Sequence, residues 1–80
     1  MLLANGLNAA IIGLSSTPTL RAVYSVDKVL EILRKEHDFN EDEAIEWFEF
    51  NIESAYVGED TPVWVYEMDA DTLIAEFGGQ

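Results

Sequence analysis

The sequence predicts one small α+β domain that spans residues 1–80. Two segments, at about 20–24 and 63–68, are rich in β-branched and aromatic residues that alternate in the manner of half-buried strands. Two longer segments, at about 26–37 and 41–57, repeat apolar residues every three or four positions, which indicates helices. A two-stranded sheet is stable only when other elements cover or extend it, so we expect the helices to pack on it.

Composition supports a folded chain with a single core. Apolar residues make up 49% of the 80 residues and aromatic residues 11%, which is more than a disordered chain carries. Cysteine is absent, so packing or self-association must replace the disulfides of other small domains. A homodimer that extends the small sheet is therefore one expectation.

The chain before residue 20 is expected to hold a short helix and a loop. Four apolar residues share helical spacing there: Leu7, Ala10, Ile11 and Leu14. The turn-forming run from Ser15 to Thr19 predicts a connection to the first strand. In that strand Leu20, Ala22 and Tyr24 are expected on one face.

Capping residues mark the starts of both central helices. Ser25 is a suitable N-cap for the first helix, whose apolar stripe comprises Val26, Val29, Leu30 and Leu33. Asn40 and Glu43 have the spacing of a capping box for the second helix.

The buried face of that helix is predicted to comprise Ala44, Ile45, Phe48, Ile52 and Ala55. Asn51 falls on the same side and needs a backbone partner, and Gly58 is the expected left-handed C-cap.

The C-terminal part is expected to hold a strand and a short helix. The strand at 63–68 begins after Pro62 and is predicted to pair with the strand at 20–24. Asp69 or Asp71 is the expected N-cap of the terminal helix. Leu73, Ile74 and Phe77 are its apolar residues, and Gly78 and Gly79 close it.

The charge is strongly negative and unevenly placed. Sixteen acids and four bases give a net charge of −12, and the segment 36–80 holds fourteen of the acids and no base. This field disfavours direct binding of nucleic acid or of an anionic membrane surface. It favours a basic protein partner or divalent cations.

Four acids are predicted to form a row along the second helix. At about 100° per residue they share one face, and successive members lie about 5–6 Å apart along the axis. The members of this acidic row are Asp42, Glu46, Glu49 and Glu53. Such a row is compatible with a DNA-mimicking inhibitor of a DNA-binding protein, with cation binding, or with a solvated face that maintains solubility.

Phe50 and Val57 lie beside this row and away from the buried face, and Trp47, which flanks the buried face, lies nearby. Exposed aromatic groups next to charges are common anchors of protein interfaces. These residues are therefore candidates for a contact surface, unless the N-terminal segment or the terminal helix covers them.

Nothing in the sequence indicates an enzyme. His37 is the only histidine, and without cysteine or a second histidine it forms no recognisable nucleophile or metal site. The glycines match no phosphate-binding or dinucleotide-binding loop, and no calcium-binding loop spacing is present. We therefore expect no catalytic residue, cofactor or metal.

Three segments resemble a family of small, functionally uncharacterised proteins of tailed bacteriophages and prophages. They are Ala22-Val23-Tyr24-Ser25, the run EAIEWFEFN from Glu43 to Asn51, and the run AYVGEDTPV from Ala55 to Val63. The likeness extends from about Ile11 to Val65. This chain departs from the family pattern at Asp60, where a glycine is frequent, and in the loop Ser16–Thr19, where a Gly-Gln-Pro-like run is frequent.

The resemblance implies a phage-encoded accessory protein that works in the cytoplasm of an infected bacterium. A basic region typical of a secretory signal does not follow Met1, which agrees with that location. Together with the charge, this favours protein–protein interaction with a host or phage protein. The alternative is a structural or assembly accessory protein of the phage particle.

Overall fold

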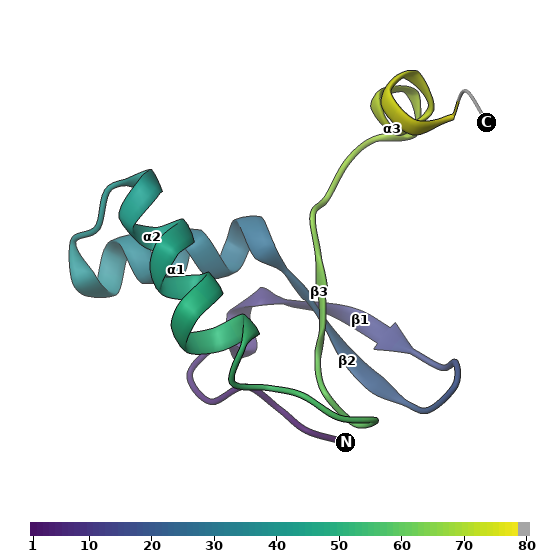
Figure 1. The fold of residues 1–80 in the computed structure, drawn as a ribbon, viewed down its shortest axis with the longest axis horizontal. Helices are drawn as coiled ribbons and strands as arrows, with labels where there is room; N and C mark the ends of the chain where they lie inside the picture. The colour runs from purple at the N-terminus through teal and green to yellow at the C-terminus, as the bar shows by residue number, and fades with distance from the viewer. Residues whose placement is uncertain (79–80) are drawn as a thin grey trace.

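The computed structural model describes residues 1–78 and confirms the α+β class (Figure 1). The elements in chain order are η1 (Asn8–Ala10), β1 (Ile11–Ser15), β2 (Arg21–Ser25), α1 (Val26–His37), α2 (Glu41–Trp47), η2 (Phe48–Glu53), β3 (Val63–Val65) and α3 (Ala70–Phe77). The helical segment η1 is a single 3₁₀ turn, and η2 is π-helical. The strands form one sheet in the order β1-β2-β3.

The sheet confirms the predicted pairing of the two strands and adds a third. β2 pairs in parallel with β3, and Val23 lies opposite Val63 while Tyr24 lies opposite Trp64. β1 pairs with β2 in the antiparallel direction, with an irregularity between Ile11 and Gly13. The prediction of a two-stranded sheet was therefore wrong in this detail.

The predicted N-terminal helix is the principal error. Only Asn8–Ala10 is helical, and the segment from Ile11 onward is strand β1. A helix would have had to bury Ile11 and Leu14, yet these side chains remain 37% and 57% exposed. The short loop after Ser15 lets the backbone of Ile11–Ser15 pair with β2, and this ladder satisfies more backbone groups than an isolated short helix does.

Strand β3 ends after Val65 and does not continue to residue 68. Its partner β2 ends at Ser25, which lies opposite Val65, because α1 begins at the next residue. A strand without a neighbour cannot extend the ladder, so residues 66–69 leave the sheet. The predicted first strand also begins one residue later than expected. Leu20 lies just before β2 and is exposed.

Helix α1 agrees with its predicted boundaries and cap. The Lys28 backbone N–H donates to the Ser25 Oγ at 3.3 Å. Lys35 and Glu31 form an exposed ion pair at 3.1 Å. Val26, Val29 and Leu33 are buried, whereas Leu30 is partly buried and His37 is exposed.

The second central helix begins as predicted but changes its geometry and ends early. In the capping box, the Glu43 N–H donates to Asn40 Oδ1 and the Asn40 N–H donates to Glu43 Oε1, each at 2.9 Å. From Phe48 the helix is π-helical, and it ends at Glu53 rather than at residue 57. Consequently Ala44 and Phe48 are buried, but Ala55 lies beyond the helix and is exposed.

Two side chains explain the widened helix. The Asn51 Nδ2 donates to the Trp47 carbonyl at 3.3 Å, and the Ser54 Oγ donates to the Phe50 carbonyl at 2.8 Å. These are the carbonyls that backbone N–H groups four residues later would use in an α-helix, so the side chains compete with the α-helical pattern. Asn51 is thus exposed and bonded to its own helix, not buried as predicted. Gly58 has the expected positive φ of 111°, but it lies in a turn after the helix and does not cap it.

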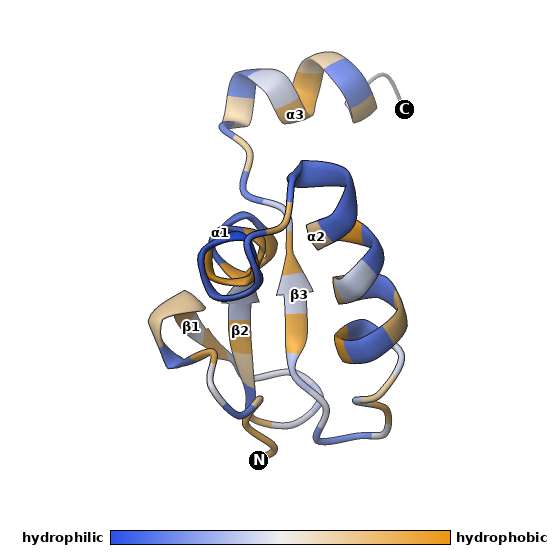
Figure 2. Cartoon of the chain, turned by 90° about the vertical axis from the view of Figure 1, so that its left-hand side faces the viewer, coloured by the Kyte–Doolittle hydropathy of each residue, from blue (hydrophilic) through white to orange (hydrophobic). Residues whose placement is uncertain are grey.

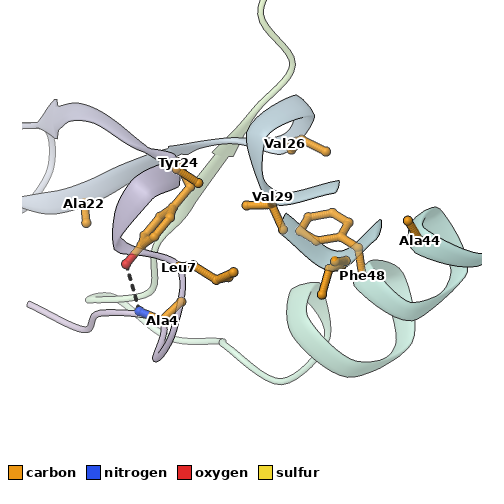
Figure 3. Close-up of a cluster of buried hydrophobic side chains, with 10 residues drawn as sticks. Ala4, Leu7, Ala22, Tyr24, Val26, Val29, Ala44 and Phe48 are labelled. Atoms are coloured by element: carbon orange, nitrogen blue, oxygen red, sulfur yellow. Dashed lines mark hydrogen bonds between the residues drawn. The ribbon is translucent and has the colours of Figure 1, made fainter. Parts of the chain in front are cut away.

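The core is formed by α1, α2, η2, the sheet and the N-terminal segment (Figure 3). Phe48 is 1% exposed and lies edge-on to Trp64 with ring centroids 5.3 Å apart. Tyr24 is fully buried, and its hydroxyl accepts a hydrogen bond from the Ala4 N–H at 2.8 Å. Leu7, which follows Ala4 in the same segment, is also buried. The segment before η1 is therefore part of the folded body.

Helix α3 stands apart from the other elements (Figure 1). None of its residues is buried, and it carries both hydrophilic and hydrophobic residues (Figure 2). Asp69 is its N-cap, as one of the two predicted alternatives had it, and accepts from the Thr72 N–H at 2.7 Å. The helix ends at Phe77 with Gly78 as its C-cap, and the predicted closing residue Gly79 lies outside the described residues.

The Asp69 cap makes the helicity of α3 dependent on pH. Hydrogen bonds from the Thr72 backbone N–H, and then from the Thr72 side chain, lower the pKa of Asp69 below its usual value. The ionised cap therefore favours the helix above the usual pH range of aspartate titration, and this contribution is lost as the pH falls through the lowered value. We expect the Thr72 amide resonance to report a titration midpoint below that of an ordinary aspartate. In D69N, which keeps an acceptor oxygen, this titration should disappear; a midpoint at the ordinary value would contradict the assignment.

Candidate interaction groove on the second central helix

The turn between α1 and α2 gathers three aromatic rings. His37 stacks on Phe39 with ring centroids 4.9 Å apart, and Trp47 lies 5.0 Å from His37 and 5.6 Å from Phe39. Asp38, in the left-handed conformation with φ of 56°, reverses the chain after α1. The local turn and the capping box that follows it thus bring the end of α1 against the far end of α2.

A groove of about 340 Å³ adjoins these rings. Its lining comprises Phe39, Glu43, Glu46, Trp47, Phe50 and Asn51. Phe50 is 74% exposed and Trp47 39%, so the aromatic surface is open to solvent. The groove therefore combines apolar rings with two carboxylates, and no basic residue lines it.

The structure brings together three of the seven predicted contact residues. Glu46, Trp47 and Phe50 line the groove. The other members of the acidic row are exposed but lie outside it: Asp42, Glu49 and Glu53. Val57 is 73% exposed in the loop that follows η2, and neither the N-terminal segment nor α3 buries it or Phe50.

The carboxylates of the acidic row have no cationic partner within residues 1–78. Lys35–Glu31 is the one ion pair formed there, and it lies on α1. Within the same residues no three acidic or histidine side chains come together as a metal site. The negative potential along α2 and η2 is thus available to a partner molecule.

Phe39, Glu43 and Asn51 belong to the groove although they were not among the predicted contact residues. Phe39 immediately precedes the Asn40 cap, and an apolar residue at this position commonly packs on the first turn of the helix that follows. That signal was present in the sequence. Asn51 was missed because an α-helical wheel places it on the buried side, and the π-helical geometry moves it to the surface.

Comparison with protein-family models, with curated proteins and with solved structures returns no match for this chain. In the part of the chain that the structure describes, no helix is both long enough and apolar enough to cross a membrane. The groove and its negative charge are therefore the features from which a function is inferred.

Proposed function

We propose that the protein acts through protein–protein interaction and that the groove on α2 and η2 binds a basic segment of its partner. The observation that carries this proposal is the placement of Phe39, Trp47 and Phe50 beside Glu43 and Glu46 in one open groove. An arginine or lysine side chain gains from both features, because aromatic faces attract cations and carboxylates pair with them.

The energetic contributions of the aromatic and charged groups are those of a binding surface. A cation on an aromatic face contributes about 0.5–2 kcal/mol, and aromatic residues supply much of the binding free energy in protein interfaces. The unpaired acids Asp42, Glu49 and Glu53 extend the negative surface beyond the groove. They would accelerate the encounter with a positively charged protein and make it sensitive to salt.

The resemblance to small phage proteins suggests the setting. We propose an accessory protein that meets a host or phage protein in the cytoplasm of an infected bacterium. The most specific form of this proposal is that the partner is a DNA-binding protein, which this chain inhibits by mimicking DNA. The change from α-helical to π-helical geometry at Phe48 interrupts an even spacing of carboxylates, so the aromatic groove supports basic-segment recognition better than it supports strict phosphate mimicry.

A peptide titration tests this function. The probes are two labelled peptides of equal length, one of alternating arginine and glycine and one of alternating glutamate and glycine. We expect the arginine peptide alone to bind, to shift the Trp47 indole and Phe50 amide resonances, and to bind more weakly as salt rises. Neutralising three row carboxylates together, in E46Q/E49Q/E53Q, should weaken binding about tenfold or more.

A charge-matched variant separates the acidic row along α2 and η2 from the overall charge. D60N/E67Q/E76Q removes the same number of exposed carboxylates from outside α2 and η2. We expect this control to bind the arginine peptide nearly as the wild type does. Equal weakening by both triple variants, or binding that does not respond to salt, would contradict the proposed site.

A further inference from the structure

Helix α3 presents an apolar face that the single chain leaves uncovered. Leu73, Ile74 and Phe77 are 49%, 63% and 58% exposed, and no residue of the helix is buried. An isolated helix of eight residues is marginal in water, because few hydrogen bonds offset the cost of its nucleation. Burial of this face against another surface would supply the missing stabilisation.

A large apolar groove adjoins the same face. Its volume is about 710 Å³, and its apolar lining comprises Ile12, Val65, Tyr66, Met68, Leu73 and Phe77. The lining thus comes from β1, from β3 and the segment after it, and from α3 itself. One chain therefore carries an apolar helix and, beside it, an apolar groove.

The accessible surface shows how much area a partner would have to cover. A monomeric protein of 9.0 kDa is expected to expose about 4,850 Å². This chain exposes 5631 Å², which is about 780 Å² more. An interface of standard size removes about 800 Å² from each partner, so the additional surface is similar in size to one such interface.

The shape agrees with the surface area. The radius of gyration is 13.7 Å, whereas about 11.6 Å is expected for a compact domain of 80 residues. The projecting α3 accounts for the extended outline (Figure 1). The molecule is thus less compact than a self-contained monomer of this length.

We infer that the face formed by α3 and its adjoining groove binds a second copy of the same chain in a two-fold symmetric dimer. A two-fold axis places the helix of each copy in the groove of the other. The apolar helix face and the apolar groove of both copies are then covered in a single interface. The charged lining of the groove consists of Lys28 and Glu67, and Lys28 forms no ion pair within residues 1–78. The helix of one copy would bring Asp71 or Glu76 toward Lys28 of the other, so this contact is favourable only where it avoids Glu67.

This dimer is independent of the proposed binding of a basic partner, and salt distinguishes them. Each chain has a net charge of −12, so two copies repel one another, and salt that screens this repulsion should strengthen an apolar dimer. Binding of the arginine peptide to the acidic groove should respond in the opposite direction. Failure of either result leaves the other standing.

Sedimentation equilibrium of the full chain tests the inference, from micromolar to millimolar concentration and at low and high salt. We expect the mass to rise from 9.0 kDa toward twice that value, at lower concentration in high salt. F77D and I74D should each weaken dimerisation about 30-fold or more, as expected for the loss of a central interface residue. Because no residue of α3 is buried in the single chain, these variants should retain the thermal unfolding of the core.

F50D provides the matched control. Phe50 is 74% exposed, and it lies on η2 in the groove proposed to bind the arginine peptide, not in the groove beside α3. F50D should leave the dimer constant unchanged. A chain that stays monomeric at all these concentrations would overturn the inference and leave the α3 face to a different protein. Dimerisation that F50D abolishes and F77D does not would equally overturn it, because the interface would then lie on η2.

Discussion

Replacement of Phe48 with alanine is expected to destabilise the fold by about 3–5 kcal/mol. Phe48 is 1% exposed, and its ring lies edge-on to Trp64 between the helices and the sheet. The mutation removes this apolar contact and leaves a cavity that the surrounding core can only partly fill. Because an 80-residue domain has a total stability of about 4–12 kcal/mol, F48A should lose a large share of it and would unfold if the wild type lies at the lower end of that range. Urea denaturation followed by tryptophan fluorescence measures the change.

The neighbouring phenylalanine supplies the control. Phe50 lies two positions away and is 74% exposed, so F50A should alter the stability by no more than about 0.5 kcal/mol. The same variant should weaken binding of the arginine peptide about tenfold, as expected for an interface anchor. A large loss of stability in F50A would mean that Phe50 is part of the core and would contradict the groove.

Replacement of Tyr24 with phenylalanine is expected to cost about 1–3 kcal/mol and to loosen the N-terminal segment. The Tyr24 hydroxyl is the acceptor for the buried Ala4 N–H, at 2.8 Å (Figure 3). Phenylalanine fills nearly the same volume but leaves this N–H without its partner. Denaturation should report the loss of stability, and hydrogen exchange at Ala4 should accelerate.

Tyr66 offers the comparison for this variant. Its side chain is 59% exposed after β3, so Y66F should leave both the stability and the exchange at Ala4 unchanged. Unaltered exchange at Ala4 in Y24F would show that another group satisfies the N–H. In that case the hydroxyl would not hold the N-terminal segment in place.

Local signals in the sequence were reliable where all the interacting groups lie within a few residues. The Ser25 cap, the Asn40–Glu43 capping box and the Asp69 cap each join a side chain to a backbone group three residues away. The apolar stripe of α1 is equally local, and three of its four residues are buried. Such contacts depend on helix geometry alone, so spacing is sufficient to predict them.

Contacts between distant segments explain the errors. Leu7, Ala10, Ile11 and Leu14 have helical spacing, but the pairing of Ile11–Ser15 with β2 outweighs that preference. β3 stops at Val65 because β2 stops at Ser25. The residue pattern of 63–68 alone cannot predict this end, because it depends on the partner strand. The same holds for the hydrogen bond from Ala4 to Tyr24, which joins residues twenty positions apart.

The candidate groove was predictable in part. Glu46, Trp47 and Phe50 followed from the helical wheel because they lie on or next to the regular α2 turn. Phe39 and Asn51 entered the groove through the turn after α1 and through the widened helix η2, respectively. A helical wheel with a constant pitch predicts neither the turn after α1 nor the widening of the helix at η2.

The sequence by itself determined the α+β class, the starts of α1 and α2 and the negative charge of the C-terminal half, because each depends on composition or on neighbours along one turn. Only the tertiary structure decided which strand joins β2 on its second side, where the central helix widens, and that α3 stays uncovered. These outcomes arise from competition among backbone and apolar groups far apart in the chain, and that competition is resolved only when the segments meet in space.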